Sequence, residues 1–198
     1  MDDELQQKLA TAGWIARSLF ERGKTAGSTA NLSFRHNDII YITGSGTCFG
    51  TLTAEQFAAV AADGTVQGKM APSKELPLHE ILFARDGGIG AVIHTHSFYA
   101  TLWSCLAHAN PADIVPDYTP YLKMKVGTVG LIPYAKPGSR ELFAAFADRA
   151  HLSDGYILQN HGLIVGGASL MDAFFAAEEL EESAKIAWHL RNEKAHTI

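Results

Sequence analysis

The sequence has 198 residues, of which 47% are hydrophobic and 19% charged, and its formal net charge is -5. This size suits one hydrophobic core, so we expect residues 1–198 to form a single domain. The acidic balance and the scattered lysines and arginines argue against nucleic-acid binding. No apolar run reaches the roughly 20 residues that span a bilayer, and residues 2–4 are acidic where a signal peptide would be basic. We therefore expect a cytoplasmic protein with small-molecule partners, no membrane contact and two reduced cysteines.

Helical and extended spacings of apolar residues alternate along the chain, without a linker or a repeat. In chain order the sequence predicts a helix over 5–20, a hairpin of strands 31–34 and 39–43, a short helix after Thr53 that carries Phe57 and Val60, a helix capped by Ser73, a strand over 91–94, a helix over 98–106, a loop over 111–120, a strand over 128–132, a helix over 139–150, strands over 156–158 and 163–165, and a last helix from Ser169 to about Asn192.

Two capping patterns support these helix starts, namely Thr53 with Gln56 and Ser169 with Asp172. The helix capped by Ser73 would carry Glu75 in its first turn. Because some strands are joined by hairpins and others through helices, we expect the α/β class. The predicted architecture is a three-layer α/β/α domain around a central mixed, mainly antiparallel sheet.

Three histidines in two short motifs suggest a metal site. His94 and His96 lie two positions apart at the predicted end of a strand, so both rings can face the same side. His161 lies in a predicted turn and can supply a third imidazole. Three protein ligands leave a coordination position open, and Glu75 is a carboxylate outside that set which can carry a proton. This combination predicts a metal-dependent enzyme.

The other titratable residues have simpler interpretations. A His-Thr-His segment alone is also typical of strand ends that bond to backbone carbonyls, and the third histidine, between Asn160 and Gly162, favours metal ligation. His79 lies one helical turn after Glu75 and could either orient that carboxylate or pack in the core. We expect the remaining histidines to be solvated, and also the acidic residues 178–182 of the last helix.

A glycine-rich segment with polar neighbours suits a phosphate group. Glycines let backbone N–H groups approach an anion closely. Hydroxyl, amide and ammonium groups nearby add further donors, two of them at a helix start. The residues predicted to bind phosphate are Asn31, Thr43, Gly44, Ser73 and Lys74.

Five motifs in this order resemble those of the class II aldolase/adducin family. They are Ala30-Asn31-Leu32-Ser33, Thr43-Gly44-Ser45-Gly46, Pro72-Ser73-Lys74-Glu75, His94-Thr95-His96 and Asn160-His161-Gly162. The resemblance spans nearly the whole chain. It implies a class II aldolase-like fold, a catalytic zinc held by the three histidines, Glu75 as the acid/base, a bound phosphate and a homotetramer. Histidines also accept Mn²⁺ or Co²⁺.

Within that family the chain is more closely similar to the 3-oxo-tetronate 4-phosphate decarboxylases. The features shared with that branch are residues 72–75, Thr119-Pro120-Tyr121 with Met124, and the glutamates of 178–182. This similarity implies a carbon–carbon lyase that releases CO₂ and dihydroxyacetone phosphate through a metal-stabilised enediolate. Tyr121, in the middle loop, is a candidate for a substrate contact.

Other functions stay open at this stage. A sugar-phosphate aldolase of the fuculose, rhamnulose or ribulose type would pass through the same enediolate, and a methylthioribulose-phosphate dehydratase would use similar ligands. A metal-stabilised sugar-phosphate binding protein or an adducin-like interaction domain would need no acid/base. Two positions depart from the family pattern: Ala30 stands where glycine is usual, and Lys74 replaces the second serine of the aldolases.

Overall fold

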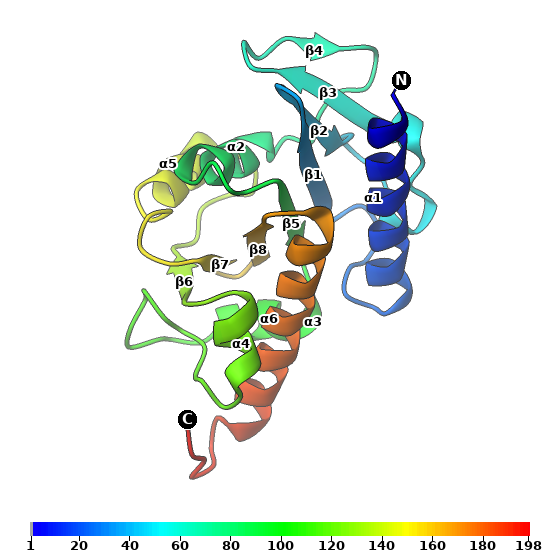
Figure 1. Ribbon diagram of the computed structural model, residues 1–198. Helices are drawn as coiled ribbons and strands as arrows, with labels where there is room; N and C mark the ends of the chain where they lie inside the picture. The colour runs from blue at the N-terminus through cyan, green and yellow to red at the C-terminus, as the bar shows by residue number, and fades with distance from the viewer. Residues whose placement is uncertain (1) are drawn as a thin grey trace.

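Helices and strands alternate along most of the chain in the computed structural model, which describes residues 2–198 (Figure 1). Within that range the helices are α1 Asp3–Glu21, α2 Leu76–Arg85, α3 Phe98–Ser104, α4 Pro120–Lys125, α5 Arg140–Ala147 and α6 Leu170–Leu190, with short 3-10 turns η1 Phe49–Thr51 and η2 Ala54–Gln56. The strands are β1 Asn31–His36, β2 Ile39–Thr43, β3 Phe57–Ala61, β4 Val66–Gln67, β5 Ala91–Thr95, β6 Val129–Ile132, β7 Gly155–Leu158 and β8 Gly162–Gly167.

The eight strands of the described chain form one sheet in the order β4-β3-β2-β1-β5-β8-β7-β6. Its strand pairs are antiparallel, apart from the parallel pair β6 and β7. At the centre, β5 pairs with both β1 and β8, which come from distant parts of the sequence. The prediction of a mixed, mainly antiparallel sheet is confirmed.

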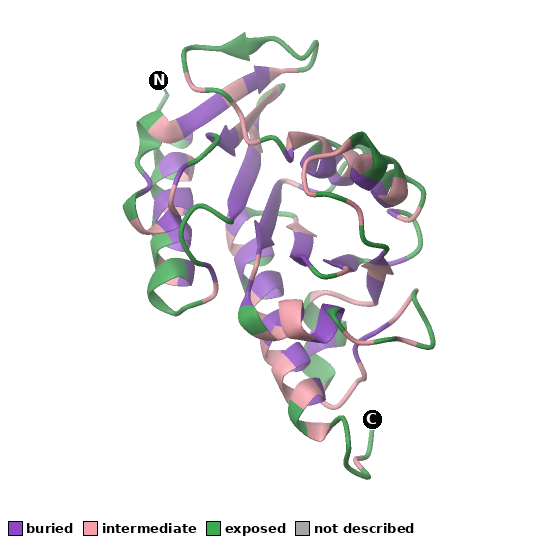
Figure 2. Cartoon of the chain, turned by 180° about the vertical axis from the view of Figure 1, so that it is seen from behind, coloured by how far each residue is buried: buried purple, intermediate pink, exposed green. Residues whose placement is uncertain are grey.

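Helices cover both faces of this sheet. Apolar side chains of α1, α3 and α6 form one buried cluster with β1, β5 and β8, whereas α2 and α5 form a second cluster on the opposite face. Alternation along β5 produces this division, because Ala91 and Ile93 belong to the first cluster and Val92 to the second. The central strands are buried, while the β4 hairpin and the C-terminal segment are exposed (Figure 2). The predicted three-layer α/β/α architecture is confirmed.

Side-chain caps fix several helix starts. Asp2 accepts a hydrogen bond from the Leu5 N–H at 2.7 Å, and Ser169 accepts one from the Asp172 N–H at 3.2 Å. Each satisfies one of the backbone donors that a helix leaves free at its first turn. The predicted start of the last helix at Ser169 is thereby confirmed.

The helix predicted after Thr53 is wrong. Thr53 and Gln56 do form their reciprocal contact, with the Thr53 N–H donating to Gln56 Oε1 at 3.0 Å. The helical turn stops there, because residues 57–61 pair with β2 as strand β3 and bury Ala58 and Val60 beside Ile42. Sheet pairing outweighs the local helix signal.

The prediction that Ser73 caps α2 is also wrong. The residue before the helix is Glu75, and the Ser73 hydroxyl accepts a hydrogen bond from the Glu75 N–H at 3.3 Å. Pro77 lies in the first turn of α2, where its missing N–H is tolerated. As a result Glu75 lies at the cap instead of inside the helix. Two short elements, β4 and α4, have no counterpart among the predicted elements.

Both cysteines, Cys48 and Cys105, are free thiols, as expected. None of the helices within residues 2–198 is long and apolar enough to cross a membrane.

Candidate metal-dependent active site

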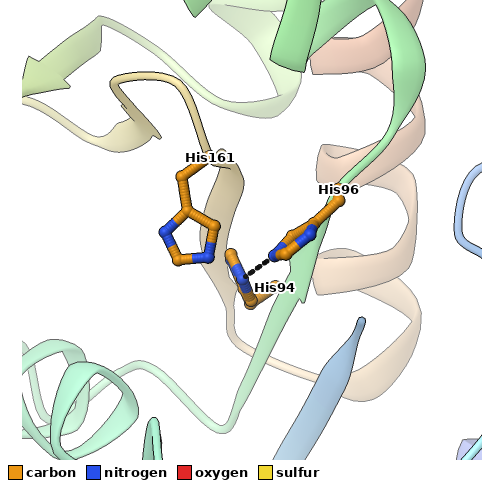
Figure 3. Close-up of side chains that lie close together, drawn as sticks. All are labelled: His94, His96 and His161. Carbon is orange, nitrogen blue, oxygen red and sulfur yellow. Dashed lines mark hydrogen bonds between the residues drawn. The ribbon is translucent and has the colours of Figure 1, made fainter. Parts of the chain in front are cut away.

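Three imidazoles meet where β5 ends (Figure 3). His94 lies in β5, His96 follows the last residue of that strand, and His161 comes from the turn between β7 and β8. One ring nitrogen from each lies within 4.8 Å of the other two, and the Nε2 atoms of His94 and His96 are 3.1 Å apart. The structure thus brings the three predicted ligands together in a group that could hold a metal ion.

The local sequence explains why His161 reaches this position. Asn160 adopts a left-handed backbone with φ of 54°, which asparagine tolerates better than most residues. A Cβ at Gly162 would lie 2.3 Å from the Thr95 carbonyl oxygen, so only glycine lets β8 approach β5 this closely. The Asn-His-Gly motif therefore turns the chain tightly and places the imidazole against the other two.

The protonation of the three rings suits metal ligation. His94 Nδ1 donates to the Leu163 carbonyl at 2.7 Å, which leaves the lone pair of Nε2 directed into the site. Burial, with His96 close by, lowers the pKa of His94 to about 3. Burial and neighbouring His94 lower the pKa of His161 to about 3, and burial lowers the pKa of His96 as well. Neutral imidazoles are the form that binds metal.

A divalent cation would also satisfy atoms that are otherwise without partners. Neither ring nitrogen of His161 has a hydrogen-bond partner among residues 2–198, although the residue is only 5% exposed. A buried polar atom left in this condition costs about 1–3 kcal/mol. Coordination through one nitrogen would remove that cost, and three imidazoles are a donor set that zinc and related transition metals prefer.

The Glu75 carboxylate lies beside the imidazoles and is 4% exposed. Its Oε2 is 3.4 Å from His94 Nε2, and its Oε1 is 3.4 Å from His161 Nε2. No hydrogen-bond donor in the described part of the chain reaches Oε1. That oxygen is therefore available to accept or give a proton.

Asn31 contacts Glu75 directly. Its Nδ2 donates to Glu75 Oε2 at 2.9 Å, and its Oδ1 lies 2.5 Å from His79 Nε2. The other ring nitrogen of His79, Nδ1, is 2.7 Å from Ser33 Oγ. The pairing of β1 with β5 places Asn31 opposite His94, so its amide lies beside His94, His96 and His161, which we call the metal group. An amide predicted to bind phosphate is thus hydrogen-bonded to the predicted acid/base.

A cavity of about 180 Å³ opens onto His96, His161 and Glu75. Mostly polar residues and glycines line the rest of it. They are Ser28, Thr29, Ala30, Asn31, Gly44, Ser45, Gly46, Thr47, Ser73, Lys74 and Pro137. Four of the five residues predicted to bind phosphate are in this lining. Serines 28 and 45, Thr29, Thr47 and Pro137 were not among the predicted site residues, and Pro137 comes from a loop with no recognisable signal in the sequence.

The glycine turn at the cavity offers fewer backbone N–H groups for a phosphate than its motif suggests. The Gly44 N–H donates to the Gln56 carbonyl at 2.8 Å, and the Ser45 N–H donates to the Ala71 carbonyl at 2.9 Å. A Cβ at Gly44 would lie 2.2 Å from Met70 Sδ, so the Met70 side chain packs directly against this glycine. Neither of these two N–H groups is directed at an anion in the cavity.

Two predicted residues lie away from this cavity. Thr43 is fully buried, and its hydroxyl accepts a hydrogen bond from the Leu32 N–H at 3.2 Å. Tyr121 is 57% exposed on α4, and neither residue belongs to the cavity lining. Within one chain, the structure does not bring them to the metal group.

Two predicted solvated side chains are buried instead. Glu181 is 2% exposed, because its carboxylate accepts hydrogen bonds from the Tyr99 and Ala100 N–H groups at the start of α3. His36 is 5% exposed, and its Nε2 lies 3.0 Å from Asp2. Glu181 matters for the site, since the helix start that it caps follows His96 directly.

Comparison with known proteins agrees with this geometry. The model of the "Class II Aldolase and Adducin N-terminal domain" family matches residues 11–188. The chain belongs to the class II aldolase/adducin family. The matched range contains all five motifs found in the sequence, and the predicted membership is confirmed.

Individual relatives of this family are similar over most of their length. A 3-oxo-tetronate 4-phosphate decarboxylase of Haemophilus influenzae is 36% identical over 195 residues, which cover 98% of this chain and 92% of the relative. An L-fuculose phosphate aldolase of Methanococcus maripaludis is 33% identical over 181 residues, or 91% of this chain and 96% of the relative. The crystal structure of YgbL from Escherichia coli superposes with a TM-score of 0.94 at 34% identity, covering 99% of this chain and 95% of that one.

Proposed function

We propose that this protein is a metal-dependent carbon–carbon lyase that decarboxylates a 3-oxo-tetronate 4-phosphate to dihydroxyacetone phosphate and CO₂. The observation that carries the proposal is the convergence of three neutral imidazoles and one carboxylate at a polar cavity. The full-length similarity to a decarboxylase of that name supports this substrate. The intact metal group argues against a purely adducin-like interaction domain.

Each residue has a distinct part in this proposal. His94, His96 and His161 would hold the divalent ion, with His94 fixed in its tautomer by the Leu163 carbonyl. The chemistry that such an ion supplies is Lewis-acid stabilisation of the negative charge that develops as CO₂ leaves. Glu75, after taking up a proton from solvent on Oε1, the carboxylate oxygen that faces His161, gives that proton to C2 of the substrate.

Another part of the cavity lining is the proposed phosphate site. Ser73 and Lys74 line it together with the glycine turn. A lysine ammonium and a serine hydroxyl are suitable donors for a phosphate, and the ammonium adds charge complementarity. A bound phosphate there would fix the substrate at one end, so that the reacting carbons lie near the metal group. A phosphorylated small molecule is therefore the proposed partner.

Three further features belong to this proposal. Zinc is the proposed metal, because three histidine ligands with an open position are typical of catalytic zinc, although Mn²⁺ or Co²⁺ could replace it. A homotetramer is proposed from the family resemblance, and in it Tyr121 of α4 could contact the substrate of a neighbouring subunit. A cytoplasmic location is proposed because phosphorylated intermediates of sugar metabolism are made and used there.

Turnover by the metal-loaded protein tests the proposed function. We expect rapid release of CO₂ and dihydroxyacetone phosphate from 3-oxo-tetronate 4-phosphate, and loss of that activity after chelation. L-Fuculose 1-phosphate is the matched second substrate, because an aldolase would cleave it to an aldehyde and dihydroxyacetone phosphate. Aldehyde release without CO₂ release would contradict the decarboxylase and assign the chain to the aldolase branch.

A further inference from the structure

A hydrogen-bond chain reaches Glu75 from outside the cavity. It runs from Ser33 in β1 to His79 in α2, then to Asn31 in β1, and ends on Glu75 Oε2. His79 is fully buried and does not line the cavity. It therefore does not face the substrate, and its hydrogen-bond connection with Glu75 passes through the Asn31 amide.

The contacts of His79 and Asn31 fix which group donates and which accepts in each hydrogen bond of this series. A carboxylate accepts hydrogen bonds, so the Asn31 group that meets Glu75 Oε2 is the NH₂, and its carbonyl Oδ1 points at His79. Oδ1 can only accept, so His79 Nε2 carries a hydrogen and donates it. Nδ1 then accepts from the Ser33 hydroxyl at 2.7 Å. Burial lowers the pKa of His79 to about 3, in accord with a neutral ring that has one donor and one acceptor nitrogen.

The direction matters because an asparagine amide is nearly symmetric in shape. Without a donor at His79 Nε2, the Asn31 amide could turn over and bring its oxygen to Glu75 Oε2. Two acceptors would then face each other in a buried site, and the carboxylate would have to move. The ring of His79 prevents this, because only the observed amide orientation satisfies both neighbours.

We propose that His79 is a positioning residue for the acid/base: through Asn31 it holds Glu75 Oε2 and leaves Oε1 as the proton-carrying oxygen. The inference rests on the proposed function, since it assigns a role within the same site. It gives His79 a purpose beyond packing α2 against β1, and it gives Asn31 a role in holding Glu75 besides any contact with phosphate.

Two substitutions of similar size separate positioning from packing. His79→Gln keeps an N–H that can reach the position of Nε2, whereas His79→Leu fills the space without a donor. We expect His79→Leu to lower kcat by about 10- to 100-fold, as is typical when the residue that orients a site ligand is lost. KM and zinc content should change little, and His79→Gln should recover most of the lost kcat. Equal kcat in the two variants would overturn the proposal.

A double-mutant cycle tests whether the effect passes through Asn31. If it does, adding His79→Leu to Asn31→Ala should lower kcat by less than about twofold beyond Asn31→Ala alone, because the pathway is already broken. If the two effects multiply, His79 acts independently of Asn31 and the proposal is wrong.

The tautomer of His79 can be measured without any turnover, which separates this inference from the choice of substrate. In protein labelled with ¹⁵N-histidine, we expect NMR to show the hydrogen of His79 on Nε2, with its resonance shifted in Asn31→Ala. A hydrogen on Nδ1 would overturn the hydrogen-bond chain. If the wild-type protein shows the Nε2–H tautomer but does not decarboxylate the substrate, the proposed function is refuted and the hydrogen-bond chain through His79 remains supported.

Discussion

The two oxygens of the Glu75 carboxylate have different surroundings, and this difference defines its chemical role. Oε2 accepts from Asn31 at 2.9 Å, whereas Oε1 is without a donor among the described residues. Replacing Glu75 by glutamine keeps the shape but removes the group that carries the proton. We expect Glu75→Gln to lower turnover by about 10² to 10⁴. Zinc content, measured on the same preparation, should stay unchanged because the imidazoles are the ligands.

Glu80→Gln is the matched control for that substitution. Glu80 lies on the exposed side of the same helix and outside the cavity lining. The charge change is identical, so any effect of net charge or of α2 itself would appear in both variants. Normal turnover in Glu75→Gln would refute the acid/base role, while equal losses in both variants would point to a general effect on the fold.

Single residues also show where sequence reasoning ends. The spacing of Glu75 and His79 left two possibilities open, orientation of the carboxylate or packing. The sequence does not show that Asn31 lies between them, because that contact depends on strand register. Glu181 belongs to an acidic run that indicates a solvated face, yet α3 packs over it and uses its carboxylate as a cap. Burial of a charged residue follows from distant contacts that no local pattern encodes.

At the scale of elements, the turn between β7 and β8 holds the metal group together. Gly162 lets β8 lie against β5, and a Cβ there would come within 2.3 Å of the Thr95 carbonyl and 3.0 Å of the His96 ring. Because the Thr95 contact is with backbone, one of the strands would have to shift. We expect Gly162→Ala to destabilise the fold by about 1–3 kcal/mol. Displacement of the ligands should also weaken zinc binding by about 10-fold or more.

Urea unfolding and zinc titration would check both effects, with Gly87→Ala as the control. Gly87 lies in a turn where an added Cβ would meet nothing within 4 Å. The same methyl group at that site should leave zinc affinity and the free energy of unfolding nearly unchanged. Unaltered zinc affinity in Gly162→Ala would show that the close approach of β8 to β5 does not set the ligand geometry.

Elements with strong local signals were predicted well from the sequence, and those decided by pairing were not. The helix α6 follows from its Ser169 cap and its long apolar period, and the β1–β2 hairpin follows from its polar turn. The segment Phe57–Ala61 carried a genuine capping box before it and still became a strand, since β2 offered an unpaired edge. The edge of a neighbouring strand is a tertiary feature, invisible to a pattern read along the chain.

For the whole molecule, the position of the site at the centre of the sheet has a thermodynamic cost. Strand β5 brings His94 under α2, where burial lowers its pKa to about 3, and burial does the same to His79. In the unfolded chain both rings return to an ordinary pKa of about 6.5. Below that value the unfolded chain therefore binds more protons than the folded one. The free energy of unfolding is therefore unaffected by these rings above pH 6.5, and it falls progressively as the pH is lowered toward 3.

Chelated, metal-free protein should accordingly lose stability between about pH 6.5 and 5, at up to about 1.4 kcal/mol per pH unit for each of these two rings and for His161, whose pKa is lowered in the same way. Carboxylates with lowered pKa, such as Asp2 and Glu4, titrate below this window and do not contribute to the slope. Urea unfolding at several pH values measures the slope of stability against pH. His79→Gln should reduce this slope, whereas substitution of exposed His151 should not. Excess zinc should raise the stability most at the upper end of the window, because protons compete with the metal for the imidazoles. A flat dependence in the chelated protein would mean that the imidazoles take up protons in the folded state.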